Sequence, residues 1–383
     1  MRALAFVMLG FVVPASGFAV NSHMDRSLLQ AGCSSCHEGH GASRSPMLPA
    51  PQLELCLSCH GSRNRADAQI SRGVMAPNVE LTLLTNTLTE PYTHPLSPEA
   101  FSREEPGAVT CTSCHTPHRG AADGARREVS RGGAKLSTRD PTQLEWELCQ
   151  SCHGSAGVST QNLLDISRFT NPNNPSYHPI EAPAPGTSPS IVSELSGQVV
   201  NCTDCHGNSN RSGPRGPHGS SIRFLLSRNY VTIDGDRESP QAYALCYECH
   251  DREAVLEVSP FPQHGQHIVE YRASCATCHS AHGSVDNRSL IRYGEEVIIG
   301  GVSRSISTGL LRFESTGEGS GACYLTCHAV DHNPKTYGGE MPVIDTLAGT
   351  QPGPFGIDVE SSAAGPPQPK KKPRQRPTKP PPR

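Results

Sequence analysis

The chain has 383 residues and a formal net charge of −3, so no strong field indicates nucleic acid or a membrane surface as a partner. It contains 36 Gly and 34 Pro but only 5% aromatic residues, which leaves few apolar side chains for a conventional core. The 16 Cys and 18 His are therefore the residues expected to hold the interior together.

The N-terminal residues have the pattern of a secretory signal peptide. Arg2 is followed by an apolar run over residues 3–13, then by Pro14 and small residues up to Ala19. The alternative is an uncleaved membrane anchor, but the run is too short to span a bilayer comfortably. We therefore expect a signal peptide over residues 1–19. The mature chain would be exported to the periplasm or the cell exterior, with no membrane span.

Every cysteine belongs to one repeated motif. Seven segments read Cys-x-x-Cys-His, and an eighth, at residues 323–328, has one extra residue between its cysteines. This motif attaches c-type haem, because two thiols add to the two vinyl groups of the porphyrin and the next His binds the iron. The motifs predict eight covalently bound haem c groups. The predicted attachment residues are Cys33, Cys36, Cys56, Cys59, Cys111, Cys114, Cys149, Cys152, Cys202, Cys205, Cys246, Cys249, Cys275, Cys278, Cys323 and Cys327, and the predicted proximal iron ligands are His37, His60, His115, His153, His206, His250, His279 and His328.

Three other chemistries compete for these cysteines. A disulfide framework suits an exported Cys-rich chain but does not require a His after every second Cys. Zinc ribbons need two Cys-x-x-Cys units for each ion and give the recurring His no role. A thioredoxin-like redox pair occurs once in a domain, not eight times. The motif pattern therefore favours haem.

The remaining ten histidines distinguish a carrier from an enzyme. An electron-transfer haem needs a second strong axial ligand, whereas a catalytic haem keeps an open position. Because ten His are available for eight irons, we expect bis-His ligation throughout. The sequence does not choose between His264 and His267. The predicted distal ligands are His23, His40, His94, His118, His178, His218, His267 and His282, with His264 and His332 less certain.

The histidines repeat with the motifs in four units. Each unit has an upstream His, a motif with a companion His, and a second motif, which predicts di-haem units at 20–80, 81–165, 166–255 and 256–335. A companion His three residues beyond a proximal His cannot reach the far face of the same haem. We therefore expect it to bind the partner haem of its unit, and the upstream His to cap the first haem.

The motif pairs resemble those of a known family. Residues 111–118 read Cys-Thr-Ser-Cys-His-Thr-Pro-His, and residues 55–61 and 148–154 read Leu-Cys-x-x-Cys-His-Gly. These segments resemble the doubled Cys-x-x-Cys-His multihaem cytochromes c of exported bacterial and archaeal proteins, and the resemblance covers residues 23–332. It implies bis-His c-type haems, electron transfer, and redox partners such as other multihaem cytochromes. The widened eighth motif and an insertion before His218 depart from the family pattern.

The peptide between the motifs predicts a loop-rich, mostly irregular fold with short α-helices and minor β structure, built from four di-haem units. Asp140-Pro141 and Ser239-Pro240 predict helix starts before Cys149 and Cys246. Small hairpins are expected at 233–236 and 292–307. Residues 336–383 form a predicted extended tail, rich in Pro, Lys and Arg and disordered from 366, which is either a solubilising end or a tether to an acidic partner.

Together these features predict an exported electron carrier rather than an enzyme. The alternative is an octahaem reductase of nitrite, hydroxylamine or tetrathionate with one open haem, often marked by Lys in place of the proximal His. No motif here ends in Lys, and His is in surplus. The sequence does not separate a monomer from a filament, in which a leftover His such as His332 or His23 could ligate a haem of the next subunit.

Overall fold

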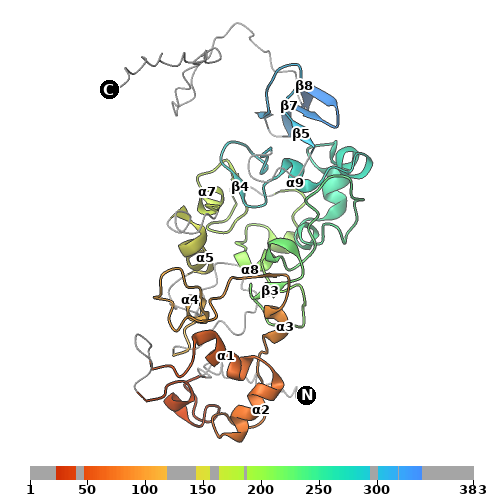
Figure 1. Ribbon diagram of the computed structural model, residues 1–383. Helices are drawn as coiled ribbons and strands as arrows, with labels where there is room; N and C mark the ends of the chain where they lie inside the picture. Colours follow the sequence, from red (N-terminus) through yellow and green to blue (C-terminus); the bar gives the residue numbers. More distant parts are fainter. Residues whose placement is uncertain are drawn as a thin grey trace, which may run out of the picture. The chain divides into compact units, whose positions relative to one another are not determined.

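Short helical segments joined by loops carry most of the motifs in the computed structural model (Figure 1). The structure describes residues 23–39, 47–118, 144–155, 164–184, 188–293, 301–317 and 319–338. The predicted signal peptide, the companion His40, the helix start at Asp140-Pro141 and the tail from residue 339 lie outside the described residues. Loops and few regular elements confirm the loop-rich fold class, while the four di-haem units stay a prediction.

Seven motifs lie on helices or single helical turns. The repeated bond from the His backbone N–H to the carbonyl of the first Cys, 2.9 Å in the first motif, closes one turn around the two cysteines. These elements are η1 Gly32–Ser35, α1 Gln52–His60, α4 Cys111–Cys114, α5 Glu145–His153, α8 Cys202–Cys205, η4 Cys246–Glu248 and α9 Cys275–Cys278.

The other helices are short and connect the motifs. α2 begins at Arg63 because the Ser62 side chain accepts from the backbone N–H of Arg65, and it packs against α1. The bounds are α2 Arg63–Ser71, α3 Thr85–Leu88, α7 Ser167–Thr170, η2 Ser193–Leu195, η3 Arg223–Leu225, η5 Ala254–Val258 and η6 Gln266–Glu270, the last two being π-helical.

Two pairs of two-residue strands join distant segments of the chain. β1 Tyr92–Thr93 pairs antiparallel with β3 Gly219–Ser220, and β2 Ser176–Tyr177 pairs antiparallel with β4 Gly283–Ser284. Each pair connects the segment just before an upstream His with the segment just after a companion His. The two small sheets therefore tie neighbouring motif units together.

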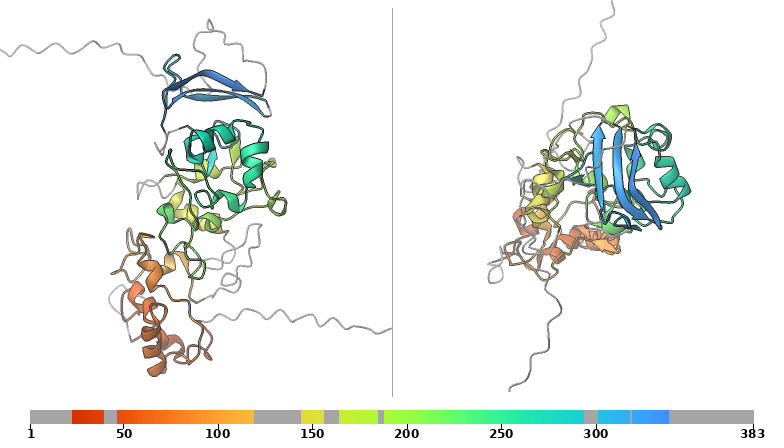
Figure 2. Two further views of the ribbon diagram at one scale, coloured as in Figure 1. Left: turned by 90° about the vertical axis from the view of Figure 1, so that its right-hand side faces the viewer. Right: turned by 90° about the horizontal axis from the view of Figure 1, so that it is seen from above.

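A four-stranded sheet follows the seventh motif (Figure 2). Its strands are β5 Val302–Ser303, β6 Arg312–Gly317, β7 Ser320–Cys327 and β8 Val330–Tyr337, and β7 pairs antiparallel with each of the other three. Tyr293, Phe313 and Leu325 form a buried cluster against it. The sheet contains the eighth motif.

The predicted hairpin at 233–236 is wrong, and the one predicted at 292–307 lies partly outside the described residues. Residues 233–236 form a turn that no described strand flanks. In the described part of 292–307, β5 pairs with β7 instead of folding back on its own segment. Among the described helices, none has the length and apolar character needed to cross a bilayer.

Candidate functional site

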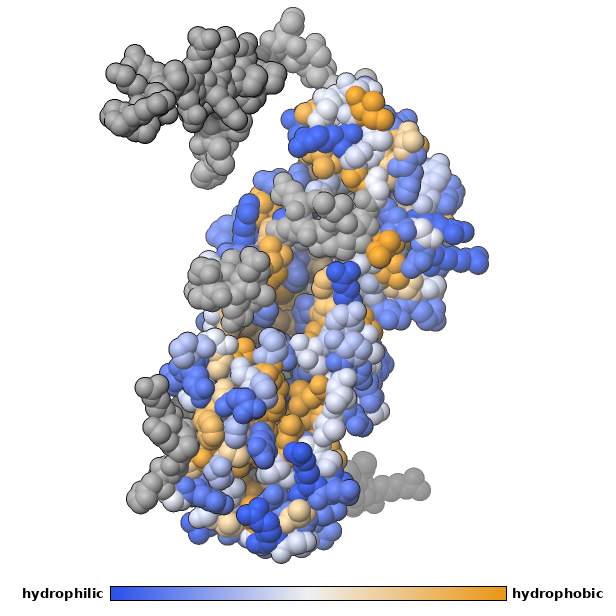
Figure 3. Space-filling model, in the orientation of Figure 1, coloured by the Kyte–Doolittle hydropathy of each residue, from blue (hydrophilic) through white to orange (hydrophobic). Residues whose placement is uncertain are grey.

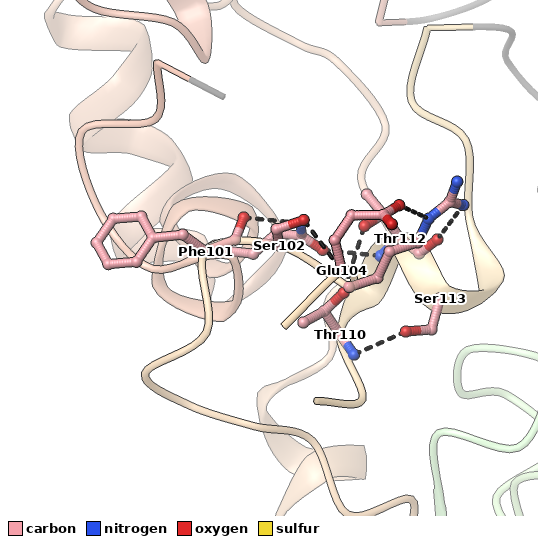
Figure 4. A network of polar contacts seen from close by, with 8 residues as sticks. Phe101, Ser102, Glu104, Thr110, Thr112 and Ser113 are labelled. Atoms are coloured by element: carbon pink, nitrogen blue, oxygen red, sulfur yellow. Dashed lines mark hydrogen bonds and ion pairs between the residues drawn. The ribbon is translucent and has the colours of Figure 1, made fainter. Parts of the chain in front are cut away.

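The residue before the first cysteine caps the helical turn in several motifs. In the third motif the backbone N–H of Thr110 donates to Ser113 Oγ at 3.0 Å (Figure 4). Asn201 N–H donates to Asp204 at 2.7 Å in the fifth motif, and the Ser274 and Thr277 hydroxyls bond in the seventh. The residues between the cysteines thus shape the turn that holds both thiols on one side.

Seven motif histidines each face a second histidine ring from elsewhere in the chain. The ring centroids lie between 5.8 and 6.4 Å apart. In every pair, one ring belongs to a Cys-x-x-Cys-His motif and the other does not. The pairs are His37 with His118, His60 with His23, His115 with His218, His153 with His94, His206 with His282, His250 with His178, and His279 with His264.

This spacing fits one iron between the two rings of each pair. An imidazole nitrogen binds a metal at about 2 Å, and the ring centroid lies about 1 Å behind that nitrogen, so rings on opposite sides of one iron have centroids about 6 Å apart. Ordinary ring packing also occurs at such distances. It does not explain why each pair combines one motif His with one other His.

The partners differ from those that we expected from the sequence. The upstream His of each of the first three units faces the second motif of that unit, as His94 faces His153, whereas His264 faces the first motif of the fourth unit. The companion His faces the first motif of the preceding unit, as His118 faces His37. Apart from His264 with His279, these pairs differ from the expected pairing within each unit, because that expectation considered only histidines close in sequence. His23, named as a possible link to another subunit, faces His60 of its own chain.

Hydrogen bonds orient several of these rings. Because a carbonyl oxygen only accepts, an imidazole bonded to one through Nδ1 carries its proton there and leaves Nε2 free to bind a metal. His250 and His264 make the corresponding contact with Ser190 and Ser259 hydroxyls. The carbonyl partners are Thr82 for His60 (3.0 Å), Pro217 for His94 (2.6 Å), Ala281 for His178, Phe224 for His206 (2.9 Å), Gln263 for His267 (2.9 Å) and Ser289 for His279 (2.8 Å).

Burial keeps the rings in the metal-binding form. It lowers the pKa of His115 to about 4, with smaller contributions from His218, His60 and His23. It lowers the pKa of His282 to about 4 in the same way, with His206 next in effect. Because only the neutral imidazole has a lone pair for a metal, these sites favour ligation over protonation at neutral pH.

The two small sheets position the upstream and companion histidines together. His94 directly follows β1, and His218 directly precedes β3; the carbonyl before His218 also binds the His94 ring. His178 and His282 have the same arrangement around β2 and β4, where the His178 N–H donates to the His282 carbonyl at 3.1 Å. Each small sheet thus positions two histidines from outside the motifs, and these two rings face the histidines of two successive motifs.

Two left-handed turns orient the carbonyl groups that hydrogen-bond with two motif histidines. Phe224 and Leu225 have φ of 63° and 59°, and Ser289 and Leu290 have φ of 56° and 57°. Phe224 provides the carbonyl for His206, and Ser289 provides the carbonyl for His279. Non-glycine residues adopt this conformation only where the surroundings hold them, so the repeated turn indicates a positioning role.

The cysteines of successive motifs lie near one another. Cys56 hydrogen-bonds with Cys111, Cys149 with Cys202, and Cys246 with Cys275, which joins the second motif of each unit to the first motif of the next. Within units, burial and then the nearby Cys59 thiol raise the pKa of Cys36. Cys205 and Cys249 are neighbours in the same way, as are Cys278 and Cys323.

The third and fourth motifs are neighbours as well. The pKa of Cys149 is raised first by its hydrogen bond with Cys202, then by burial, and also by the nearby Cys114 thiol. The eight motifs therefore follow one another in space in the order of the sequence. All sixteen cysteines are free, and none forms a disulfide.

On the face shown in Figure 3, a band of hydrophobic residues runs between hydrophilic ones. A porphyrin ring fits such an apolar surface.

The sequence analysis missed a polar anchor at the junctions between units. Glu145, the first residue of α5, is 2% exposed and accepts from Thr203 N–H at 2.7 Å and from Thr203 Oγ1 at 3.0 Å. Gln52, the first residue of α1, accepts from Thr112 N–H at 2.8 Å in the same way. Both residues stand four positions before the first Cys of an even-numbered motif. This shared position could have indicated the anchor from the sequence.

Replacing Glu145 by alanine should destabilise the protein by about 1–3 kcal/mol, because two donors of the half-buried Thr203 lose this acceptor. Guanidinium unfolding followed by circular dichroism measures the change. Glu145→Gln is the matched control, since Gln52 performs this role at the preceding junction. Equal losses for the Ala and Gln variants would contradict the anchoring role.

The eighth motif lies on a strand, whereas the other seven lie on helices or helical turns. Cys323 and Cys327 lie on strand β7, where four residues span about 13 Å, whereas three residues along a helix span about 5 Å. His328 Nε2 lies 3.5 Å from Asp234 Oδ2, and ligand atoms of Asp234, Cys327 and His328 lie within 4.8 Å of one another. His267, predicted as a distal ligand, faces His332.

Comparison with known proteins agrees with the haem chemistry of the motifs. The doubled CXXCH motif family matches residues 27–65 and 196–255. C-type polyheme cytochrome OmcC of Geobacter sulfurreducens is 28% identical over 184 residues, which cover 43% of this chain and 21% of that cytochrome. No solved structure matches the chain. The findings support a multihaem c-type cytochrome with covalently bound haem c.

Proposed function

We propose that the chain is an exported octahaem c-type cytochrome that carries electrons by hopping along bis-His haems, in periplasmic or extracellular electron transfer. The observation that carries the proposal is the set of seven histidine pairs at 5.8–6.4 Å, each containing one motif His. The apolar run over residues 3–13 supports export. Its partners would be redox proteins such as other multihaem cytochromes, or further copies of this chain.

The chain's residues perform two tasks in this function. Bound haem supplies one-electron oxidation and reduction at its iron. The paired imidazoles would hold each iron from both sides, so the ligand set would change little with each electron. The cysteine contacts bring successive motifs together, as Cys56 meets Cys111, so an electron follows the order of the motifs along the chain.

The test is an EPR spectrum of the oxidised, haem-loaded protein, integrated against its iron content. We expect all haem to be low-spin, because each iron has two imidazole ligands. Intact mass counts the attached haems, and eight is the expected number. A high-spin signal equal to one haem per chain would instead support the octahaem reductase alternative, since it requires one open axial position.

A further inference from the structure

Among the described residues, the histidine of the eighth motif faces no other histidine ring. His328 and Ala329 form the turn between β7 and β8, with φ of 47° and 64°. The His328 side chain is 55% exposed, and its Nε2 points to the Asp234 carboxylate at 3.5 Å. In the other seven motifs, the corresponding His faces a second ring at about the separation that a shared iron requires.

His332 occupies the face of the sheet that carries the motif's cysteines. Alternate residues of a strand share a face, so Cys323, Leu325 and Cys327 lie together on β7. His332 is paired directly with Leu325 across the two strands, which places it on that same face. Leu325 is 5% exposed, and Cys278 of the seventh motif packs against its cluster, so this face looks toward the preceding motif.

His332 has the partner that His328 lacks. Its ring lies 6.3 Å from the His267 ring, within the 5.8–6.4 Å range of the seven motif pairs. His267 donates from Nδ1 to the Gln263 carbonyl at 2.9 Å, which leaves its Nε2 available. Nδ1 of His332 is buried and has no hydrogen-bond partner. A buried imidazole nitrogen without a partner is costly unless something binds that ring.

We propose that His267 and His332 are the axial ligands of the eighth haem iron, and that His328 is not a ligand. The inference rests on the proposed function, because it assumes that the chain binds haem between paired histidines. His328 instead positions the hairpin turn through Asp234, which also accepts from Ser274 N–H at the start of the seventh motif. The haem would lie against the face that presents Cys323 and Cys327.

The test compares His332→Ala, His267→Ala and His328→Ala in the full-length, haem-loaded protein. EPR integrated against iron content should show one high-spin haem per chain in the His332 and His267 variants and none in the His328 variant. Added imidazole should return the His332→Ala spectrum to low-spin, which a folding defect would not allow. His332→Gln, which keeps a polar side chain of similar size, should give the same spectrum as His332→Ala.

Two results would overturn this assignment. One is a high-spin haem in His328→Ala together with an unchanged His332→Ala spectrum. The other is an intact mass showing seven haems in the unaltered protein, because the pair would then have no haem to bind. His218→Ala separates this failure from failure of the proposed function: a high-spin haem in that variant supports bis-His ligation elsewhere, whereas an unchanged spectrum contradicts the proposed function itself.

Discussion

Replacing His118 by alanine should convert one low-spin haem to high-spin, and that haem should be the one bound by His37 of the first motif. The two rings lie 5.9 Å apart with an interplanar angle of 18°. His118 therefore serves a haem of the preceding unit, although it lies three residues beyond His115 in the sequence. Removal of one axial imidazole leaves an open position, which weakens the ligand field at that iron.

A double variant identifies the iron that His118 binds. His37→Ala and His118→Ala should each remove one haem from the low-spin population, measured by EPR against total iron. If both residues bind one iron, His37→Ala combined with His118→Ala should also remove only one, because the effects of shared partners are not additive. His37→Ala combined with His218→Ala is the control and should remove two, since His218 faces His115.

Two low-spin haems lost in the His37 and His118 double variant would contradict the pairing across units. That result would favour ligation within each unit, which we expected from the sequence alone. The local argument held that a companion His cannot reach the far side of its own haem, and each described companion His faces a motif other than its own. It could not identify the correct haem, because the partner is chosen by contacts between segments far apart in the chain.

Some of the site could be read from the sequence because it depends on local chemistry. The cysteine spacing fixes a helical turn, and the expected helix before Cys149 appears as α5. The hairpin that carries the eighth motif could not be anticipated in this way. Its turn residues, His328 and Ala329, are in the left-handed region without the Asn or Gly that usually marks such a turn.

The two small sheets could not be predicted from the sequence either. Two residues in a strand give no periodicity, so neither 92–93 nor 176–177 has a strand pattern. The signal that was available is the repeated His-Gly-Ser at residues 218–220 and 282–284. In both copies the Ser is almost completely buried: Ser220 Oγ donates to the Leu226 carbonyl at 2.7 Å, and Ser284 Oγ donates to the Ile291 carbonyl at 2.8 Å.

Gly283→Ala should displace two ligands at once and destabilise the protein. A Cβ at this position would lie 2.0 Å from the Phe169 carbonyl oxygen, a backbone atom of α7 that has no rotamer to change. Overpacking of this kind costs about 1–3 kcal/mol and sometimes more. Because Gly283 pairs with Tyr177, the strand would move both His282 and His178.

The expected readout is a loss of two low-spin haems, at the fifth and sixth motifs, together with a lower unfolding midpoint. Gly207→Ala is the matched control, because a Cβ there meets its nearest atom at 3.7 Å, an ordinary contact. If Gly283→Ala kept both the low-spin count and the unfolding midpoint of the Gly207 variant, the β2–β4 sheet would not hold these ligands. If only the midpoint fell, the sheet would stabilise the fold while other contacts, such as the Ala281 carbonyl on His178, kept the rings in place.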